Sequence, residues 1–140
     1  MSYYSIHEAL KTILEGISEI QVVYGSPQTN VSGYPACIVE PISHESSIFT
    51  NTDNLRTYTF SIVLIMEYTH KPLNQALLDM EQLMDIVIDE LEGDYNLDGV
   101  LINGWGSVTE GTVVYDTDAQ GKHIFAQLQW QGRIEKKVTS

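Results

Sequence analysis

The chain has 140 residues, of which 43% are hydrophobic, so it is long enough and apolar enough to form one domain with its own core. Its formal net charge is −12, and residues 72–121 hold eleven acidic side chains but no lysine or arginine, a distribution that repels phosphate and argues against gripping nucleic acid. The longest run of strongly apolar residues, 62–66, is far shorter than the roughly 20 residues that span a bilayer, which argues against membrane insertion.

The first predicted element is an amphipathic helix over residues 5–17. Ser5 and Glu8 have the spacing of a capping box, which predicts that the helix begins at Ser5. The residues before it have neither the basic patch nor the apolar length of a signal peptide, so we expect no secretion signal. The apolar positions recur at spacings of three and four, as one buried stripe requires: Ile6, Ala9, Leu10, Ile13, Leu14 and Ile17.

Two extended segments are expected next, over residues 20–24 and 34–42. A turn-rich stretch separates them, and Pro41 is expected to close the second strand. Cys37 is the only cysteine of the chain and lies in an apolar run of this strand, so we predict a small buried thiol. A single cysteine allows no intrachain disulfide, which suits a reducing compartment.

Residues 43–55 predict a projecting loop or hairpin arm, because they are mostly Ser, Thr, Asn and acidic residues around the apolar pair Ile48-Phe49. The following strand, 57–68, has the clearest alternation in the chain, with one face aromatic and aliphatic throughout. Its other face turns from polar to apolar halfway along. This change indicates a central strand whose second half is covered on both sides, by a helix or by a neighbouring subunit.

A second amphipathic helix is predicted over residues 72–92, and Gly93 is expected to end it. Acidic residues, among them Asp79, Asp85 and Asp89, occupy much of its polar surface. That surface is either a solvated face or a charged interface. The apolar stripe comprises Leu73, Leu77, Met80, Leu83, Met84, Val87 and Leu91.

The last third of the chain predicts antiparallel strands over residues 111–116 and 122–136, joined by a turn of hairpin length. A glycine-rich kink is expected at 104–106. Trp105 is a candidate interface residue, since its two flanking glycines are a poor environment for core packing. The order of elements predicts an α+β fold in which a mostly antiparallel sheet carries both helices on one face. No linker interrupts the pattern, so residues 1–140 are expected to form a single domain.

No sequence motif indicates catalysis or a bound cofactor. The chain has no phosphate-binding glycine loop, no nucleophile elbow and no zinc-binding helix motif, and its four histidines are widely spaced. Residues 116–121 begin like a calcium loop, but Gln127 stands at the twelfth position, where a bidentate glutamate is needed. We therefore expect no catalytic residue, no cofactor, no metal site and no enzyme activity.

Four short segments spread over most of the chain carry a family resemblance. They are Ala9-Leu10 with Ile13-Leu14; Tyr34-Pro35-Ala36 leading to Glu40-Pro41; Asn54-Leu55-Arg56-x-Tyr58-x-Phe60-x-Ile62; and the helix ending near Leu91 with the turn Asn96-Leu97-Asp98-Gly99. In this combination the chain resembles the tail terminator proteins of long-tailed bacteriophages. Proteins of the related head-to-tail joining group share much of the pattern.

The resemblance implies a structural protein without enzyme activity. Such proteins form a ring, usually of six copies, that caps the tail tube, ends its polymerisation and docks the tail to the head connector. The expected partners are other copies of the chain, the tail-tube protein and the connector, and DNA passes without specific binding. The expected location is the head-proximal end of the tail in the virion, after assembly from monomers in the host cytoplasm.

A ring with head-to-tail contacts needs two different complementary patches on each subunit. The acidic block of residues 72–121 and the basic C-terminal end are one candidate pair, and the alternative is that both are merely exposed to solvent. Three other functions stay open: another adaptor at the same junction, a tail-tube subunit, and a small-molecule binder or enzyme using the acidic helix. The candidate interface or lumen residues are Phe49, Asp79, Asp85, Asp89, Trp105, Arg133, Lys136 and Lys137.

Overall fold

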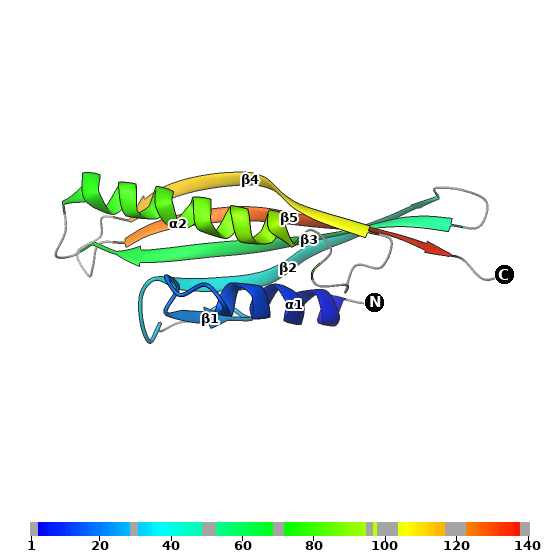
Figure 1. Cartoon of the computed structure of the whole chain (residues 1–140), viewed down its shortest axis with the longest axis horizontal. Coiled ribbons are helices and arrows are strands. Elements are labelled where there is room, and N and C mark those ends of the chain that lie inside the picture. Colours follow the sequence, from blue (N-terminus) through cyan, green and yellow to red (C-terminus); the bar gives the residue numbers. More distant parts are fainter. Residues whose placement is uncertain are drawn as a thin grey trace.

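The computed structural model of the chain describes residues 3–28, 31–48, 53–68, 72–94, 97, 104–116 and 123–137. These residues form the predicted α+β fold, with one mostly antiparallel five-stranded sheet and two helices (Figure 1). The strand order is β1-β2-β3-β5-β4, in which only the β1–β2 pair is parallel. In chain order the elements are α1 (Tyr3–Glu15), β1 (Val22–Tyr24), β2 (Ala36–Ile48), β3 (Asp53–Glu67), α2 (Leu73–Gly93), β4 (Gly104–Asp116) and β5 (His123–Lys137).

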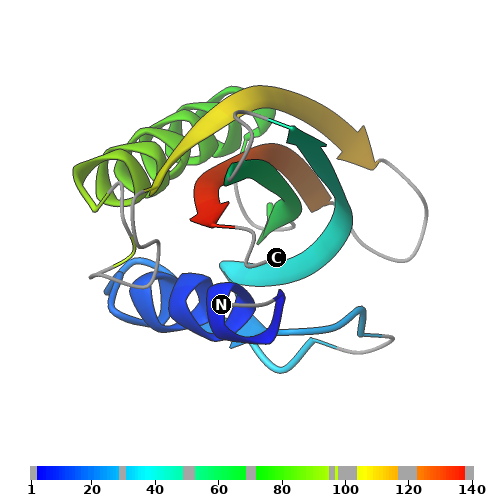
Figure 2. The ribbon, with the colours of Figure 1, turned by 90° about the vertical axis from the view of Figure 1, so that its right-hand side faces the viewer.

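Both helices lie on the same side of the curled sheet, as Figure 2 shows along the long axis of the molecule. The apolar stripe of each helix meets alternate residues of the strands, because helical and extended segments present one face at periods of 3.6 and 2. The main core includes Leu10 of α1, Val87 of α2, Ile62 of β3 and Leu128 of β5, all fully buried. Within the described part of the chain, neither helix is long and apolar enough to cross a bilayer.

Helix α1 begins at Tyr3, so the predicted start at Ser5 is wrong. The Tyr3 ring packs edge-on against Tyr58, with ring centroids 5.0 Å apart, and against Phe60 at 5.8 Å. These contacts with β3 stabilise the helical conformation of the residues before Ser5, which the local capping pattern does not predict.

The predicted end of β2 at Pro41 is wrong, because the strand continues to Ile48. The register shifts between Pro41 and Ser43, which indicates a β-bulge at the proline. A bulge is one of the few places where a strand tolerates proline, because proline has no N–H to donate. Past the bulge the ladder resumes, and the His44 ring stacks on Tyr58 with centroids 5.9 Å apart.

Strand β3 is the third of five, which confirms the prediction of a central strand. On the sheet face away from the helices, Ile65 belongs to a small buried cluster with Ala36 and Ile38. Among the described residues, Val31 and Tyr34, which precede β2, cover this cluster. The expectation that a helix covers the second half of β3 on this face is therefore wrong.

The predicted glycine kink at 104–106 is wrong, because these residues are paired strand residues at the start of β4. Gly106 lies opposite Gly132 of β5, and the Trp130 ring lies over both. A Cβ atom at Gly106 would stand 2.2 Å from Trp130 Cζ2, and one at Gly132 would stand 2.3 Å from Cη2. The glycines therefore make room for a fully buried tryptophan.

Candidate assembly surfaces

One end of the sheet extends beyond both helices (Figure 1). We call it the arm and define it as residues 43–48 of β2, 53–57 of β3 and 131–137 of β5. The register pairs Ser46 with Arg56 and Thr57 with Arg133. Of the segment expected to project, 43–55, residues 43–48 and 53–55 belong to the arm, and residues 49–52 lie outside the described residues.

The arm is poorly covered on its β2 side. Side chains from Pro41 to Ser46 are all exposed, and Ile42, in the bulge, is exposed to 51%. The Tyr3 ring, whose centroid lies 5.7 Å from that of His44, is the last described part of α1 on this side. Beyond it, the described side chains of Glu45 and Ser46 are exposed.

Four of the seven basic residues of the chain lie in the arm: Arg56, Arg133, Lys136 and Lys137. With three acids in the same ranges, the arm has a formal net charge of +1. The rest of the chain has three bases and sixteen acids, a net charge of −13. The molecule is therefore strongly polarised, with its positive charge gathered at one end of the sheet.

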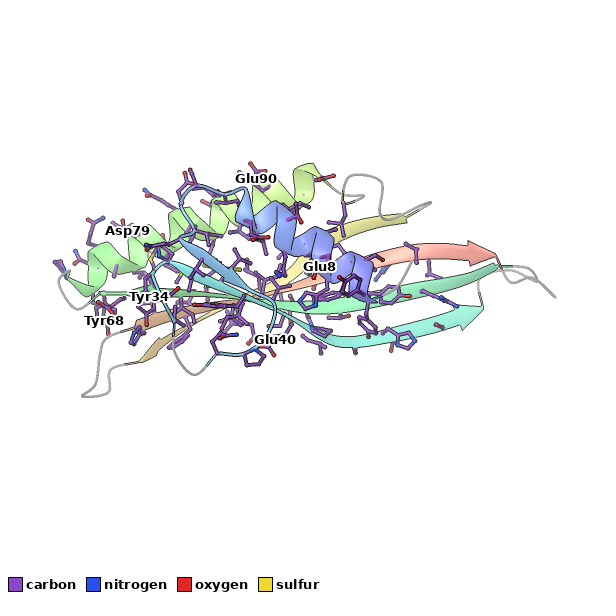
Figure 3. All side chains as sticks on the ribbon, turned by 90° about the horizontal axis from the view of Figure 1, so that it is seen from below. Glu8, Tyr34, Glu40, Tyr68, Asp79 and Glu90 are labelled. Atoms are coloured by element: carbon purple, nitrogen blue, oxygen red, sulfur yellow. The ribbon has the colours of Figure 1, made fainter. Side chains whose placement is uncertain are left out.

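The predicted acidic residues of α2 lie on its solvent side. Asp85 and Asp89 are exposed and Asp79 is half-buried, where it accepts a hydrogen bond from Gln75 Nε2 at 2.9 Å. Asp79, Gln82 and Asp89 fall on one ridge of the helix, at successive spacings of three and seven residues. Figure 3 shows Asp79 on α2, toward the end of the molecule away from the arm.

Below this ridge lies a groove of about 300 Å³. The half-buried or buried apolar side chains of Met66, Leu83 and Ile86 line it together with Pro35, and the carboxylates of Glu19 and Asp79 flank them. We call this set the acidic groove. Its lining comes from the α1–β1 connection, the residue just before β2, the end of β3 and the first two thirds of α2.

A smaller hollow of about 110 Å³ is lined by Ile42, Glu110, Thr112, Gln127 and Gln129. Next to it the sheet face away from the helices carries a polar ladder. Gln127 Nε2 donates to Ser61 Oγ at 3.1 Å. Within the described ranges, no three His, Cys, Asp or Glu side chains are grouped to hold a metal ion.

Cys37 is a buried thiol, as predicted. Burial raises its pKa to about 12, so almost none of it is thiolate at neutral pH. Burial, with a smaller contribution from Tyr58, also raises the pKa of Tyr3. Neither group is placed to act as a nucleophile or base near the groove.

The described residues of the predicted site lie on two separate surfaces. Arg133 is exposed in the arm, while Asp79, Asp85 and Asp89 lie on α2, which ends short of the arm (Figure 1). Phe49 lies outside the described residues, and for Trp105, Lys136 and Lys137 the structure gives only their positions in β4 and β5.

Sequence reasoning missed Arg56 in the arm and Glu19 and Pro35 in the groove. Arg56 joins the other basic residues only through the β3–β5 register, in which it lies opposite Ile134. The groove residues come from segments far apart in the sequence, so no local signal marks them.

No protein-family model matches the chain, and the search of curated proteins finds no significant match.

Proposed function

We propose that this chain is a structural protein of a long-tailed phage. Six copies form a ring that caps the tail tube, ends its polymerisation and docks the tail to the head connector. In the virion the ring lies at the head-proximal end of the tail. The proposal combines the resemblance carried by residues 34–36 and 54–62 with the geometry of the assembly surfaces.

The observation that carries the proposal is the arm. The β2, β3 and β5 strands continue past both helices, and the side chains of residues 41–46 are exposed. On its β2 side this ribbon has no packed layer over residues 41–46, so that side gains little stability from burial by itself. Contact with a neighbouring subunit supplies the missing layer, so the arm is suited to assembly.

The distribution of charge also fits such a role. A body with a net charge of −13 repels the phosphates of DNA, so a ring built from it lets DNA pass without gripping it. Two unlike surfaces, the basic arm and the acidic groove, supply the heterologous contacts that a closed ring requires.

The test is polymerisation of the tail-tube protein encoded in the same genome, with and without the purified chain. The proposal predicts that one ring per tube is enough to stop growth, so a small molar fraction of the chain shortens the tubes. A tail-tube subunit would instead form long tubes alone, as followed by light scattering. A chain that stays monomeric at high concentration and leaves tube length unchanged would contradict the proposal.

A further inference from the structure

Exposed apolar side chains also lie near the acidic groove and near the arm. Leu78, one turn before Gln82 on α2, is exposed to 50%, and Leu73 at the start of the helix is exposed to 46%. Ile42, at the root of the arm, is exposed to 51%. The groove therefore has an exposed aliphatic side chain beside its carboxylates, and the arm, with four basic and three acidic residues, has one next to its root.

The two surfaces are at opposite ends of the molecule. Pro35 and Met66, at the groove, lie next to Ala36–Ile65, the residue pair at one end of the β2–β3 ladder. The arm contains Ile48–Asn54, the residue pair at the other end. Eleven residues of strand separate Ile65 from Asn54, a span of about 35 Å at the usual rise of an extended chain. Because a rigid sheet holds them apart, the arm does not reach the groove of its own chain.

The charges of the two surfaces are complementary. Glu19 and Asp79 flank the groove, and exposed Asp85 and Asp89 lie beside it on α2. The arm, by contrast, holds Arg56, Arg133 and two lysines against three acidic residues, a net charge of +1. At physiological ionic strength charges act only over about 8 Å, so this complementarity orients the contact once the surfaces meet. Apolar burial supplies most of the stabilisation.

We propose that the ring closes by docking the arm of one copy into the acidic groove of the next copy. The inference rests on the proposed self-assembly and specifies its contact. A second copy is the occupant because both complementary surfaces belong to the same chain, differ from each other and lie at opposite ends. Such a heterologous contact repeats head to tail and closes into a ring.

Site-directed cross-linking tests the contact directly. The native Cys37 is fully buried with a pKa of about 12, so it does not compete for a maleimide. Ser46→Cys places an exposed thiol on the arm, and Gln82→Cys places one at the groove. With a short bismaleimide, a mixture of the two variants is expected to give a covalent dimer that neither variant gives alone.

Glu92→Cys is the matched control for the groove position. This residue is also exposed on α2, but it lies ten residues from Gln82, about 15 Å along the helix. Mixed with Ser46→Cys it is expected to give at least fivefold less dimer than Gln82→Cys. Equal yields from both positions would overturn the proposed docking.

Charge exchange gives an independent readout. Arg133→Glu and Asp85→Lys, each alone, are expected to raise the concentration of half-maximal assembly by about tenfold, which corresponds to about 1.4 kcal/mol. The combined variant has the net charge of the natural chain and is expected to assemble within about threefold of it, by the logic of a double-mutant cycle. Arg133→Glu combined with Glu92→Lys has the same net charge and is expected to stay weak. Both altered acids and Arg133 are exposed, so the variants should keep their thermal melting temperature.

Failure of this contact and failure of the proposed function give different results. If the natural chain forms rings but the Ser46→Cys and Gln82→Cys mixture gives no dimer and the charge variants are additive, the arm-to-groove contact is wrong and the ring role stands. If the natural chain stays monomeric with the tail-tube protein present, the ring role fails, and the contact fails with it.

Discussion

Replacing Gly106 with alanine is expected to destabilise the fold by about 3 kcal/mol, at the upper end of the cost of overpacking a core. The new Cβ would stand 2.2 Å from Trp130 Cζ2, whereas ordinary contact begins at 3.4 Å, so the ring must move by about 1.2 Å. Trp130 is fully buried and packs against Phe60 with ring centroids 6.0 Å apart, which leaves it little room to move.

The assay is unfolding in urea, supported by thermal melting followed by circular dichroism. For a chain of this length the loss corresponds to a fall in Tm of about 10 °C. Gly93→Ala, at the end of α2, is the matched control because no atom lies within 4 Å of the added Cβ. We expect it to raise the free energy of unfolding by less than about 1 kcal/mol, through helix propensity.

Trp130→Phe tests whether the clash is with the indole ring. The smaller ring makes room for a methyl group, and it also removes Trp130 Nε1, a buried donor without a hydrogen-bond partner among the described residues. Gly106→Ala should therefore cost at least about 1 kcal/mol less in the Trp130→Phe background. Additive effects of the two substitutions, or a Gly106→Ala protein within about 0.5 kcal/mol of the natural chain, would refute the reasoning.

Four further predictions concern the core and the sheet edge. Leu10→Ala, in the buried stripe of α1, should lower the free energy of unfolding by about 2–5 kcal/mol in urea titrations, and a loss below about 1 kcal/mol would show that the stripe is not packed as described. His7→Ala should lower the free energy of unfolding by about 1–2 kcal/mol, because His7 Nε2 hydrogen-bonds the Val39 carbonyl at 2.8 Å. Val39 lies on the edge of β2 just beyond its pairing with β1, and His7→Gln should restore part of the lost stability. The Cys37 thiol should be inert to a thiol reagent at pH 8 until the protein unfolds, and rapid reaction of the native protein would contradict its burial. Since the unfolded thiol ionises near 9 and the folded one near 12, its contribution to stability is full below about pH 9 and is lost as the pH rises towards 12, as denaturation between pH 8 and 11 can show.

The parts of the fold that sequence predicted well are those in which hydrophobic periodicity is strong. Ile6, Leu10 and Leu14 recur at the helical spacing, and Phe60 and Ile62 alternate along a strand, so burial alone determines their conformation. These patterns suffice for the element order and for the placement of both helices on one face.

Local signals failed wherever a distant residue decides the conformation. The capping pattern at Ser5 gives way to the packing of Tyr3 on β3, and Pro41 is accommodated by a bulge in a ladder that β3 continues to support. Gly106 reads as a turn residue in isolation, but it makes room for Trp130 on the neighbouring strand. Tertiary packing overrides propensity in each case.

The sequence predicts which segments carry the charge of the candidate site, but not which residues lie together on one surface. Counting residues finds the acidic block and the basic C-terminal end, yet it places Arg56 in neither group. The register between β3 and β5 brings Arg56 into the arm, and the acidic groove joins Glu19 of the α1–β1 connection to Ile86 of α2. Such groupings depend on the pairing of distant segments, which local pattern does not determine.

Electron microscopy of tube ends tests the central claim most directly. The natural chain and the tail-tube protein encoded in the same genome would be mixed, and the ends of the resulting tubes would be imaged and classified. The account predicts a closed ring of the chain at one end of each tube, with tubes of limited length. Bare ends on tubes of unrestricted length, or the chain built along the whole length of the tubes, would contradict it.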